Sequence, residues 1–526
     1  MASVPPDRAT PPDTRAYAAA MSGQPGIGAA AYRPLGRTGL TVSTLGFGGY
    51  RVHDSQAEHR LALGRSLSLG VNLIDTSSNY SDGGSEALVG RVVGELAAAR
   101  GGGRGRLVIV SKAGYVQGGN MEVAQEALSA GDPFPEMVEY HPQCWHCIHP
   151  RFLGDQLERS LERLGAQQLD VYLLHNPEYF LTDWAQRNPQ GDLAAARGEF
   201  YRRMEAAFGY LEEQVRAGRI QWYGVSSNSF GYPARHAEFV SLEALLAQAA
   251  AAARRVQGAG GDSHFGVVQC PLNLFEGGAA LERNQQGGRR TFLELAAQSG
   301  LGVLINRPLN AIHAGHLMRL ADPPPLRADW EAEQRGALDR LEAVEQDFAR
   351  RFRPAIAEHL PRDAAPMDPF NWSAAFRKLP PELNRRDAWL QALNATVYPQ
   401  VQRNGQAVAQ ALTQEPARAD YAAWFGAYAE ALEAAAGLIG EGLGRSDLEQ
   451  ARAVRVRLEP LLPAALRAQP LSQIALQVVN SIAGVTCILN GMRQTRYVED
   501  SLTVLGLPVL TAAEALAILR GLAQGA

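Results

Sequence analysis

Residues 71–75 read Val-Asn-Leu-Ile-Asp, a short apolar run that ends in an aspartate. Comparable runs recur along the chain, and helical patterns lie between them, as at 57–69 and 152–164. Continuously apolar strands that alternate with amphipathic helices predict a parallel sheet covered by helices on both faces. The predicted strands are 42–46, 71–75, 107–111, 169–174, 220–225, 265–270, 303–306 and 485–489. Eight such units predict an α/β fold, a closed (β/α)8 TIM barrel.

The chain is expected to contain more than this barrel. Residues 1–31, rich in Pro, Ala and Gly, are expected to form a disordered tail, and 32–42 a hairpin outside the eightfold count. We expect the first seven barrel units at 32–313 and the last unit with the C-terminal helix at 469–526.

Residues 314–468 separate the seventh unit from the eighth, and they show helical periodicity. The apolar faces are Leu338, Leu341, Val344 and Phe348; Trp389, Leu390, Leu393 and Val397; and Tyr421, Trp424, Phe425, Tyr428 and Leu432. We therefore predict a large all-helical insertion in the seventh βα loop. Such loops lie on the face of a barrel that carries active sites, so the insertion is either a lid over the substrate or a packing or oligomerisation appendage.

Composition excludes several classes of protein. The 526 residues include 50 basic and 54 acidic side chains, with a net charge of −4 and no basic block, so neither nucleic acid nor an anionic membrane is an expected partner. No apolar run is long enough to cross a bilayer. Four cysteines in so long a chain do not make a disulfide framework, which favours a cytoplasmic location.

Ionisable residues follow three successive predicted strands. Asp75 ends the second, Lys112 follows the third and His175 follows the fourth, while Tyr80 lies in the loop after Asp75. Neighbouring strands of a parallel sheet lie about 4.8 Å apart, so these side chains can meet at one point. Lys112 is one of two lysines in the chain, the other being Lys378, and every other basic residue is Arg. The four residues predict a proton-transfer site.

The charges suggest a role for each of these groups. A tyrosine holds its proton at neutral pH and can donate it, and a nearby ammonium lowers the pKa of the phenol. Asp75 would pair with Lys112, and His175 would orient a substrate oxygen. The competing interpretation is a buried Asp–Lys pair with no chemistry.

Five motifs carry a resemblance to a known family: Leu45-Gly-Phe-Gly-Gly-Tyr50, Asp75-Thr-Ser-Ser-Asn-Tyr80, Val110-Ser-Lys112, Leu173-Leu-His-Asn-Pro177 and Tyr223-Gly-Val-Ser-Ser-Asn228. Together they resemble the aldo-keto reductase superfamily over about 32–309 and 470–505. The resemblance implies a barrel that binds NADP(H) and acts on a small-molecule carbonyl or alcohol substrate. Tyr80 would be the general acid, tuned by Lys112 and Asp75, and the nicotinamide would supply the hydride.

The same resemblance implies a set of cofactor-binding residues. They are Gly48, Gly49 and Tyr50 beside the nicotinamide ribose; Ser226, Ser227 and Gln269 at the carboxamide; Asn306, Arg307 and Leu309 after the seventh strand; and Arg496, Glu499 and Asp500 at the adenosine end. Asn306 stands where the family commonly has a stacking aromatic ring. A guanidinium at Arg496 suits a 2′-phosphate, which favours NADP over NAD.

Other interpretations remain open. A Cys-x-x-Cys pair with three histidines at 141–149 could bind zinc, but an ordinary loop bordering the barrel mouth is favoured and no metal is expected. Two other functions compete with an oxidoreductase. One is a cofactor-binding regulatory module with negligible turnover, and the other is a lyase that uses Lys112 as a Schiff base.

Overall fold

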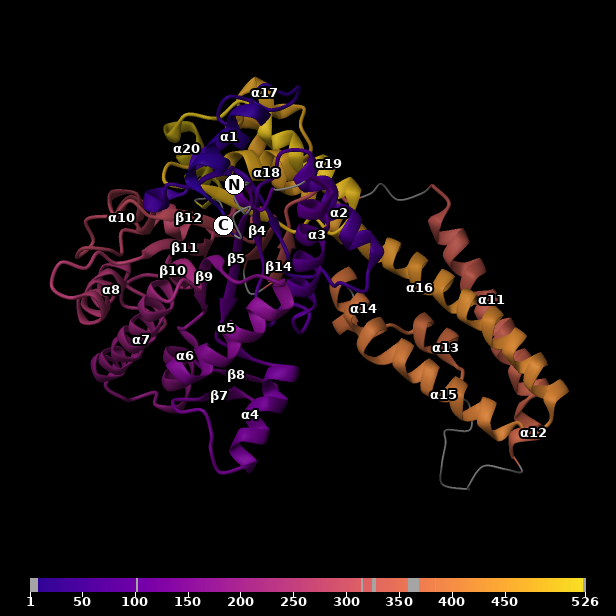
Figure 1. The fold of residues 1–526 in the computed structure, drawn as a ribbon. Coiled ribbons are helices and arrows are strands. Elements are labelled where there is room, and N and C mark those ends of the chain that lie inside the picture. The colour runs from indigo at the N-terminus through magenta and orange to yellow at the C-terminus, as the bar shows by residue number, and fades with distance from the viewer. Residues whose placement is uncertain are drawn as a thin grey trace. The chain divides into compact units, whose positions relative to one another are not determined.

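The computed structural model describes residues 8–100, 103–313, 316–323, 328–357, 369–383 and 385–523. The chain divides into two compact units (Figure 1). Met1–Ala321 with Arg457–Ala526 form the barrel unit, and Asp322–Val456 form the helical unit. The helical unit is shorter than the expected insertion, because strand β14 (His316–Arg319) and helix α17 (Ala464–Arg467) belong to the barrel unit.

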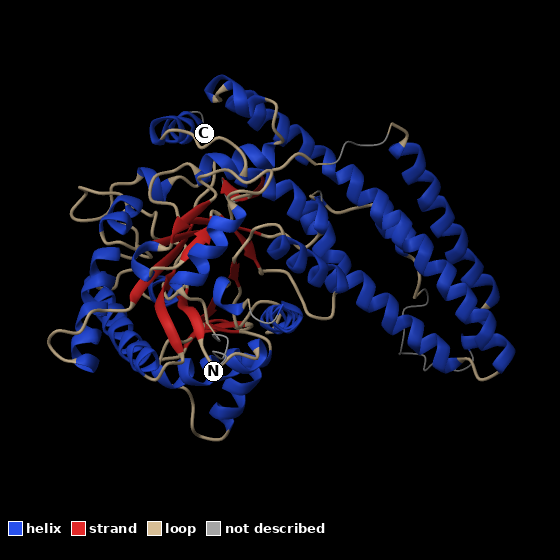
Figure 2. Cartoon of the chain, turned by 45° about the horizontal axis from the view of Figure 1, so that its top comes forward, coloured by secondary structure: helices blue, strands red, loops and turns tan. Residues whose placement is uncertain are grey.

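Eight parallel strands form a closed barrel, as the sequence predicts, and helices surround them (Figure 2). Their order around the barrel is β10-β11-β12-β15-β3-β4-β5-β9. In chain order they are β3 (Leu45–Gly48), β4 (Leu73–Asp75), β5 (Val108–Ala113), β9 (Leu169–His175), β10 (Ile220–Ser226), β11 (Phe265–Pro271), β12 (Gly302–Asn306) and β15 (Cys487–Asn490). Every residue of β5, β9 and β11 is buried, which explains why these runs lack polar alternation.

Helices cover the outside of the barrel. They are α2 (Ala57–Ser68), α3 (Gly84–Arg100), α5 (Pro150–Leu164), α6 (Tyr179–Arg187), α7 (Leu193–Arg216), α8 (Leu242–Gln257), α9 (Gly278–Leu281), α10 (Phe292–Gln298), α18 (Leu471–Asn480), α19 (Thr495–Leu502) and α20 (Ala512–Ala523), with 3-10 turns η1 (Gly36–Thr38), η2 (Arg104–Arg106), η5 (Glu459–Leu461) and η6 (Thr503–Leu505). Helix α5 shows how local residues determine where a helix begins and ends. His149 caps its first turn, Pro150 opens it, and Gly165 ends it in the left-handed conformation at φ 60°.

The N-terminal segment is ordered, so the prediction of a disordered tail is wrong for residues 8–31. Helix α1 (Pro11–Met21) begins after Thr10, whose side chain accepts a hydrogen bond from the Asp13 amide. The Ala9 amide donates to buried Asp170 Oδ1 at 2.7 Å, and Asp170 Oδ2 accepts from Arg104 at 2.8 Å. These hydrogen bonds hold the segment against the barrel although its sequence shows no helical or strand periodicity. Residues 1–7 lie outside the described residues.

Two small sheets lie beside the barrel. Strands β1 (Tyr32–Pro34) and β2 (Thr41–Ser43) form the expected antiparallel hairpin. Strand β13 (Asn310–His313) pairs with β14 in a second hairpin after β12. Because β2 ends at Ser43, the first barrel strand starts at Leu45, later than expected.

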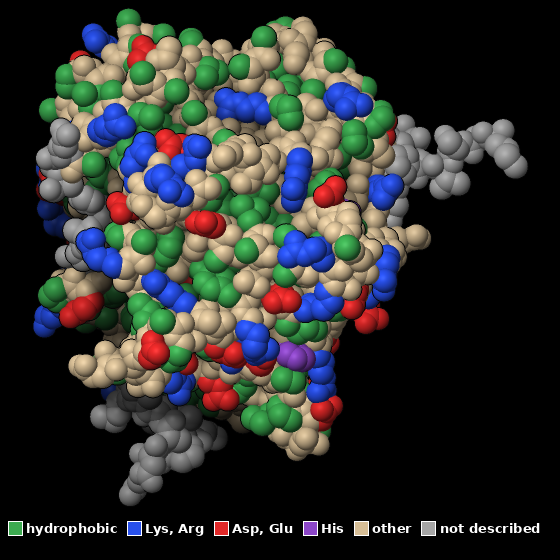
Figure 3. All heavy atoms as spheres, turned by 90° about the vertical axis from the view of Figure 1, so that its left-hand side faces the viewer, with side chains coloured by type: hydrophobic (Ala, Val, Ile, Leu, Met, Phe, Trp, Pro, Cys, Tyr) green, Lys and Arg blue, Asp and Glu red, His purple; other side chains and the backbone are tan. Residues whose placement is uncertain are grey.

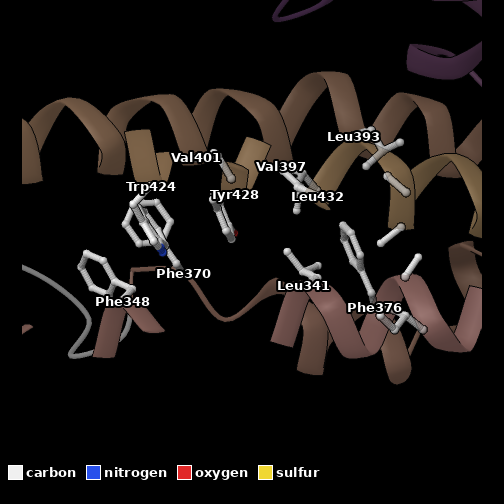
Figure 4. Close-up of a cluster of buried hydrophobic side chains, with 14 of the residues drawn as sticks. Leu341, Phe348, Phe370, Phe376, Leu393, Val397, Val401, Trp424, Tyr428 and Leu432 are labelled. Carbon is white, nitrogen blue, oxygen red and sulfur yellow. The ribbon is translucent and has the colours of Figure 1, made fainter. Parts of the chain in front are cut away.

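The helical unit contains α11 (Trp330–Arg351), α12 (Arg353–Ala357), α13 (Trp372–Arg377), η3 (Pro381–Leu383), α14 (Arg386–Ala392), the π-helical turn η4 (Leu393–Val397), α15 (Tyr398–Ala411) and α16 (Glu415–Leu458). Its core is aromatic, and side chains from several helices point toward one another (Figure 4). Trp389, Leu393 and Val397 share the buried face, but Leu390 is 45% exposed, so its assignment to that face is wrong. Trp389, Leu393 and Val397 are four residues apart, and the π-helical turn at 393–397 keeps all three on the buried face. Leu390 lies outside that face.

Within the described residues, no helix has both the length and the hydropathy that a membrane span requires. On the face of the molecule in Figure 3, basic and acidic side chains are interspersed among apolar ones.

Candidate functional site

The barrel order brings the predicted catalytic strands together. Strands β4, β5 and β9 are consecutive, and Asp75 pairs in register with Val110, two residues before Lys112. Lys112 in turn pairs with Leu173, two residues before His175. The three ionisable residues therefore lie at the carboxyl ends of neighbouring strands, as expected from the sequence.

Lys112 is fully buried and lies at the centre of the site. Its Nζ donates to Asp75 Oδ2 at 2.8 Å, to the Thr76 carbonyl at 2.8 Å and to the Tyr80 hydroxyl at 3.2 Å. These three acceptors match the three protons of an ammonium group. Burial lowers the pKa of Lys112 and raises that of Asp75, while the attraction between the two charges opposes both shifts.

Tyr80 reaches this site from the turn that follows β4. Its amide donates to the Ser77 carbonyl at 3.1 Å, and the chain then reverses through Ser81 and Asp82, which have φ values of 50° and 54°. The Tyr80 ring lies edge-on between those of Tyr50 and His175, with centroids at 5.3 and 5.7 Å. The turn thus places the Tyr80 phenol at the strand ends and sets the orientation of its ring.

The electrostatics of Tyr80 differ from the expectation. Burial, followed by the negative charge of Asp75, raises the pKa of Tyr80 well above its usual value. The Lys112 ammonium, which donates to the Tyr80 hydroxyl at 3.2 Å, is also paired with Asp75 at 2.8 Å. Tyr80 is consequently a firmly protonated group at neutral pH.

His175 is held from three sides. Its Nδ1 lies 3.0 Å from Ser77 Oγ, its backbone carbonyl is 2.7 Å from His146 Nε2, and the Tyr115 ring is 4.7 Å away at 83°. Burial, the charge of Lys112 and the neighbouring His146 hold the pKa of His175 well below its usual value. The imidazole is therefore neutral at neutral pH.

A hydrogen-bond chain extends from the ion pair to three predicted cofactor residues. Gln269 Nε2 donates to Asp75 Oδ1 at 2.8 Å, and Ser226 Oγ donates to Gln269 Oε1 at 2.9 Å. Asn306 Nδ2 lies 3.5 Å from the same oxygen, and its own buried Oδ1 has no hydrogen-bond partner in the part of the chain that is described. An unsatisfied amide oxygen beside two polar side chains fits the carboxamide of the expected nicotinamide, which has both donors and an acceptor.

The first βα loop contributes the predicted residues Gly48, Gly49 and Tyr50. The Gly49 amide donates to the Asp75 carbonyl at 2.8 Å. A Cβ at Gly49 would lie 2.6 Å from Ser85 Oγ and 2.8 Å from that carbonyl, so a larger residue does not fit. Tyr50 is 61% exposed and leaves its ring edge against Tyr80.

The remaining predicted cofactor residues contact neighbouring side chains of the protein. Ser227 Oγ is 3.1 Å from Ser229 Oγ, Arg307 donates to Glu276 at 2.8 Å with a φ of 52°, and Leu309 is buried. At the start of α19, Arg496 donates to Gln494 at 2.8 Å, whereas Glu499 pairs with Arg65 at 3.7 Å and Asp500 accepts from Gln473 at 2.9 Å. Among the described residues, the hydrogen bonds and ion pairs of these α19 side chains do not reach the four catalytic candidates.

The loop after β5, which contains the Cys/His cluster, folds into a small antiparallel sheet with one helix. Strands β6 (Tyr115–Val116), β8 (Cys144–His146) and β7 (Val138–His141) form an antiparallel sheet, joined by α4 (Gly119–Ser129). Cys147 Sγ donates to the Pro135 carbonyl and His149 caps α5, so these side chains have structural roles. The described residues contain no group of three His, Cys, Asp or Glu side chains that could hold a metal ion.

Sequence reasoning missed Ser77, Tyr115 and His146 as neighbours of His175. Ser77 lies inside the Asp75–Tyr80 motif, so the sequence could have indicated that it lies near the site. His146 was visible only as part of the Cys/His cluster. Its contact with the His175 carbonyl depends on how the loop folds over the barrel mouth.

Comparisons with known proteins show what the barrel is similar to. Residues 44–248 match the family model of the aldo/keto reductase family. The chain is 27% identical over 150 residues to the NADH-specific methylglyoxal reductase of Escherichia coli, covering 27% of this chain and 40% of that protein. It is 29% identical over 151 residues to a protein of Schizosaccharomyces pombe named "Putative voltage-gated potassium channel subunit beta", covering 28% of this chain and 37% of that one.

The chain thus matches about two fifths of the length of these curated relatives. Among solved structures, an aldo-keto reductase of Bacillus halodurans in its holo form aligns over 94% of this chain and 97% of its own, with 16% identity and a TM-score of 0.45. The matched residues 44–248 contain Asp75, Tyr80, Lys112, His175 and Ser226. Over this part of the barrel the chain is therefore similar to the aldo/keto reductase family.

Proposed function

We propose that the protein is an NADP(H)-dependent oxidoreductase that transfers a hydride between the nicotinamide and a carbonyl or alcohol substrate, with Tyr80 as general acid and base. One observation carries this proposal: a single buried ammonium, Lys112 Nζ, is within hydrogen-bond distance of both Asp75 and the Tyr80 hydroxyl. A purely structural ion pair does not require a tyrosine hydroxyl as its third acceptor.

The chemistry follows from the charges in the site. Tyr80 holds its proton until a substrate oxygen begins to gain negative charge, and it then donates that proton. The phenolate left behind lies 3.2 Å from the Lys112 ammonium, an attraction on the order of 5 kcal/mol at an effective dielectric of 20. Asp75 keeps the ammonium in place, and His175 orients the substrate oxygen beside Tyr80. When bound, the nicotinamide supplies or accepts the hydride.

The cofactor would be held along the strand ends. Ser226, Gln269 and Asn306 would bind the carboxamide, and Gly48, Gly49 and Tyr50 would lie beside the ribose. Ser227, Arg307, Leu309, Arg496, Glu499 and Asp500 would contact the remainder. A guanidinium at Arg496 favours a 2′-phosphate and hence NADP(H). The Escherichia coli relative is named NADH-specific, which makes NADH the competing cofactor.

A fluorescence titration with NADPH and NADH tests the binding step. We expect tighter binding of NADPH, and Arg496→Gln should reduce that preference while leaving NADH affinity unchanged. A carbonyl panel then tests turnover. Tyr80→Phe should lower kcat by roughly 10²–10⁴, the usual contribution of a positioned acid, without weakening nucleotide binding. Absence of binding to either nucleotide would overturn the proposal.

A cofactor-binding regulatory module is the second candidate, favoured by the name of the Schizosaccharomyces pombe relative. It predicts nucleotide binding together with turnover no higher than that of Tyr80→Phe on every aldehyde and ketone tried. Nucleotide oxidation above the Tyr80→Phe background would exclude it.

A further inference from the structure

The turn that carries Tyr80 contains three successive residues in the left-handed region of the backbone. Ser81, Asp82 and Gly83 have φ values of 50°, 54° and 83°. Glycine adopts this conformation freely, whereas a serine or an aspartate adopts it at a cost in free energy. Contacts within the turn or beyond it must therefore stabilise Ser81 and Asp82 in this conformation.

Backbone hydrogen bonds account for part of this stabilisation. The Gly84 amide donates to the Ser81 carbonyl at 3.0 Å. The Asp82 side chain adds a contact outside the turn, because its Oδ1 accepts a hydrogen bond from the Gly119 amide at 2.9 Å. Gly119 is the first residue of helix α4, 37 positions further along the chain. The turn beside Tyr80 is therefore tied to the start of α4.

Helix α4 depends on this contact because its own sequence provides no cap. The residue before the helix is Gly118, which has no side chain that could accept a hydrogen bond from the first turn. Its backbone has φ 53° and ψ −132°, and a Cβ there would lie 2.5 Å from Asp82 Oδ1. Glycine at this position leaves room for the Asp82 carboxylate to cap the helix, and the negative charge suits the positive end of the helix dipole.

A second contact joins the same two segments. The side-chain amides of Asn79 and Gln117 lie 3.2 Å apart, one residue before Tyr80 and two residues before α4. Gln117 follows strand β6, and Tyr115 of that strand lies edge-on to His175 with ring centroids at 4.7 Å. The segment that leads into α4 therefore contacts the surroundings of two catalytic candidates.

We propose that Asp82 is a positioning residue for Tyr80: by capping α4, its carboxylate holds the left-handed turn in place and keeps the phenol beside the Lys112 ammonium. Asp82 is exposed, and among the described residues it has no hydrogen bond to the four catalytic candidates, so it acts through the backbone of the turn. The catalytic meaning of this role rests on the proposed function. The position of the phenol, in contrast, is a property of the protein without cofactor or substrate.

Three variants of the turn separate the effect of the cap from the flexibility of the backbone. Asp82→Gly removes the carboxylate and relieves the strain at the same residue. Ser81→Gly is the matched control, because it relieves similar strain one residue earlier and leaves the carboxylate in place. Asp82→Asn keeps an oxygen that can accept the Gly119 amide, and asparagine caps helices about as well as aspartate.

Carbon-13 NMR of protein labelled at the tyrosine Cζ tests the position of the phenol directly, with the Tyr80 signal identified by its loss in Tyr80→Phe. Without nucleotide, Asp82→Gly should shift the Tyr80 signal, while Ser81→Gly and Asp82→Asn should leave it within its line width. An unchanged signal in Asp82→Gly, or an equal shift in Ser81→Gly, would overturn the proposal. Because this measurement does not depend on turnover, its failure is distinguishable from a failure of the proposed function.

Kinetics measure the catalytic consequence. With NADPH and a carbonyl compound that the unmodified protein reduces, Asp82→Gly should lower kcat about tenfold, a part of the roughly hundredfold loss that a misplacement of about 1 Å can cause. The KM for the carbonyl compound and the dissociation constant for NADPH should stay unchanged, and Asp82→Asn should retain the kcat of the unmodified protein. An unchanged kcat in Asp82→Gly, or a rise in KM alone, would overturn the positioning role.

Discussion

The charged network at the strand ends of the barrel unit contrasts with the aromatic cluster in the core of the helical unit. At the strand ends the barrel buries Asp75 and Lys112 in a network that includes Tyr80. The helical unit buries an aromatic cluster around Trp424 and Tyr428, whose rings stack at 5.2 Å (Figure 4). Buried charges are expensive unless they are paired, whereas aromatic burial is favourable in itself. Stability alone explains the helical core, while the network in the barrel calls for a chemical explanation.

The two lysines of the chain allow the largest effect to be tested, since one lies in each unit. Lys112→Met leaves Asp75 buried with no counter-ion, and we expect a loss of roughly 3–5 kcal/mol in the free energy of unfolding. It also removes the group that stabilises the Tyr80 phenolate, so turnover should be abolished. Urea unfolding and NADPH oxidation measure the two effects.

Lys378→Met is the matched control in the helical unit. Lys378 is exposed, so its replacement should change the free energy of unfolding by no more than about 0.5 kcal/mol. Equal losses in the two variants would mean that Lys112 is no more important than a surface lysine, contrary to the geometry of the site.

The aromatic core of the helical unit is tested by two adjacent residues of α14. Trp389 is 1% exposed and its Nε1 donates to the Ala436 carbonyl at 3.0 Å, whereas Leu390 is 45% exposed. Trp389→Ala should cost about 3 kcal/mol through the cavity and the lost hydrogen bond, and Leu390→Ala much less. The unfolding of the helical unit, followed by circular dichroism, distinguishes them. Comparable losses would place Leu390 in the core after all.

How far the sequence predicts the structure differs between features. The barrel strands were predictable to within one or two residues, except at the first strand, because buried parallel strands are continuously apolar. The proximity of the four catalytic candidates was predictable because Asp75, Lys112 and His175 end or follow such strands and Tyr80 lies in the loop after one; their catalytic role stays a prediction. The order at residues 8–31 was not, since it depends on Asp170, which accepts the Ala9 amide from 161 residues away. The raised pKa of Tyr80 was also missed, because it depends on distances that spacing does not give.

The smallest expected effect concerns a buried carboxyl in each unit. Glu178 is 4% exposed, and its Oε1 accepts the Asn228 amide at 2.7 Å while its buried Oε2 has no partner among the described residues. Burial raises the pKa of Glu178 from 4.5 to about 7. In the helical unit, both oxygens of Glu345 accept hydrogen bonds from Ser373.

Because its folded pKa is the higher one, Glu178 contributes stability that is complete below about pH 4.5 and lost as the pH rises through about 7. Over this range the loss is roughly 3 kcal/mol at most, since one pKa unit corresponds to about 1.36 kcal/mol. Glu178→Gln cannot ionise, so its stability should fall less than that of the unmodified protein between pH 5 and 8. Glu345→Gln should flatten the curve less, because Ser373 stabilises the carboxylate there. Parallel curves of unfolding free energy against pH for Glu178→Gln and the unmodified protein would contradict this prediction. They would show that Glu178 ionises in the folded protein at the same pH as in the unfolded chain.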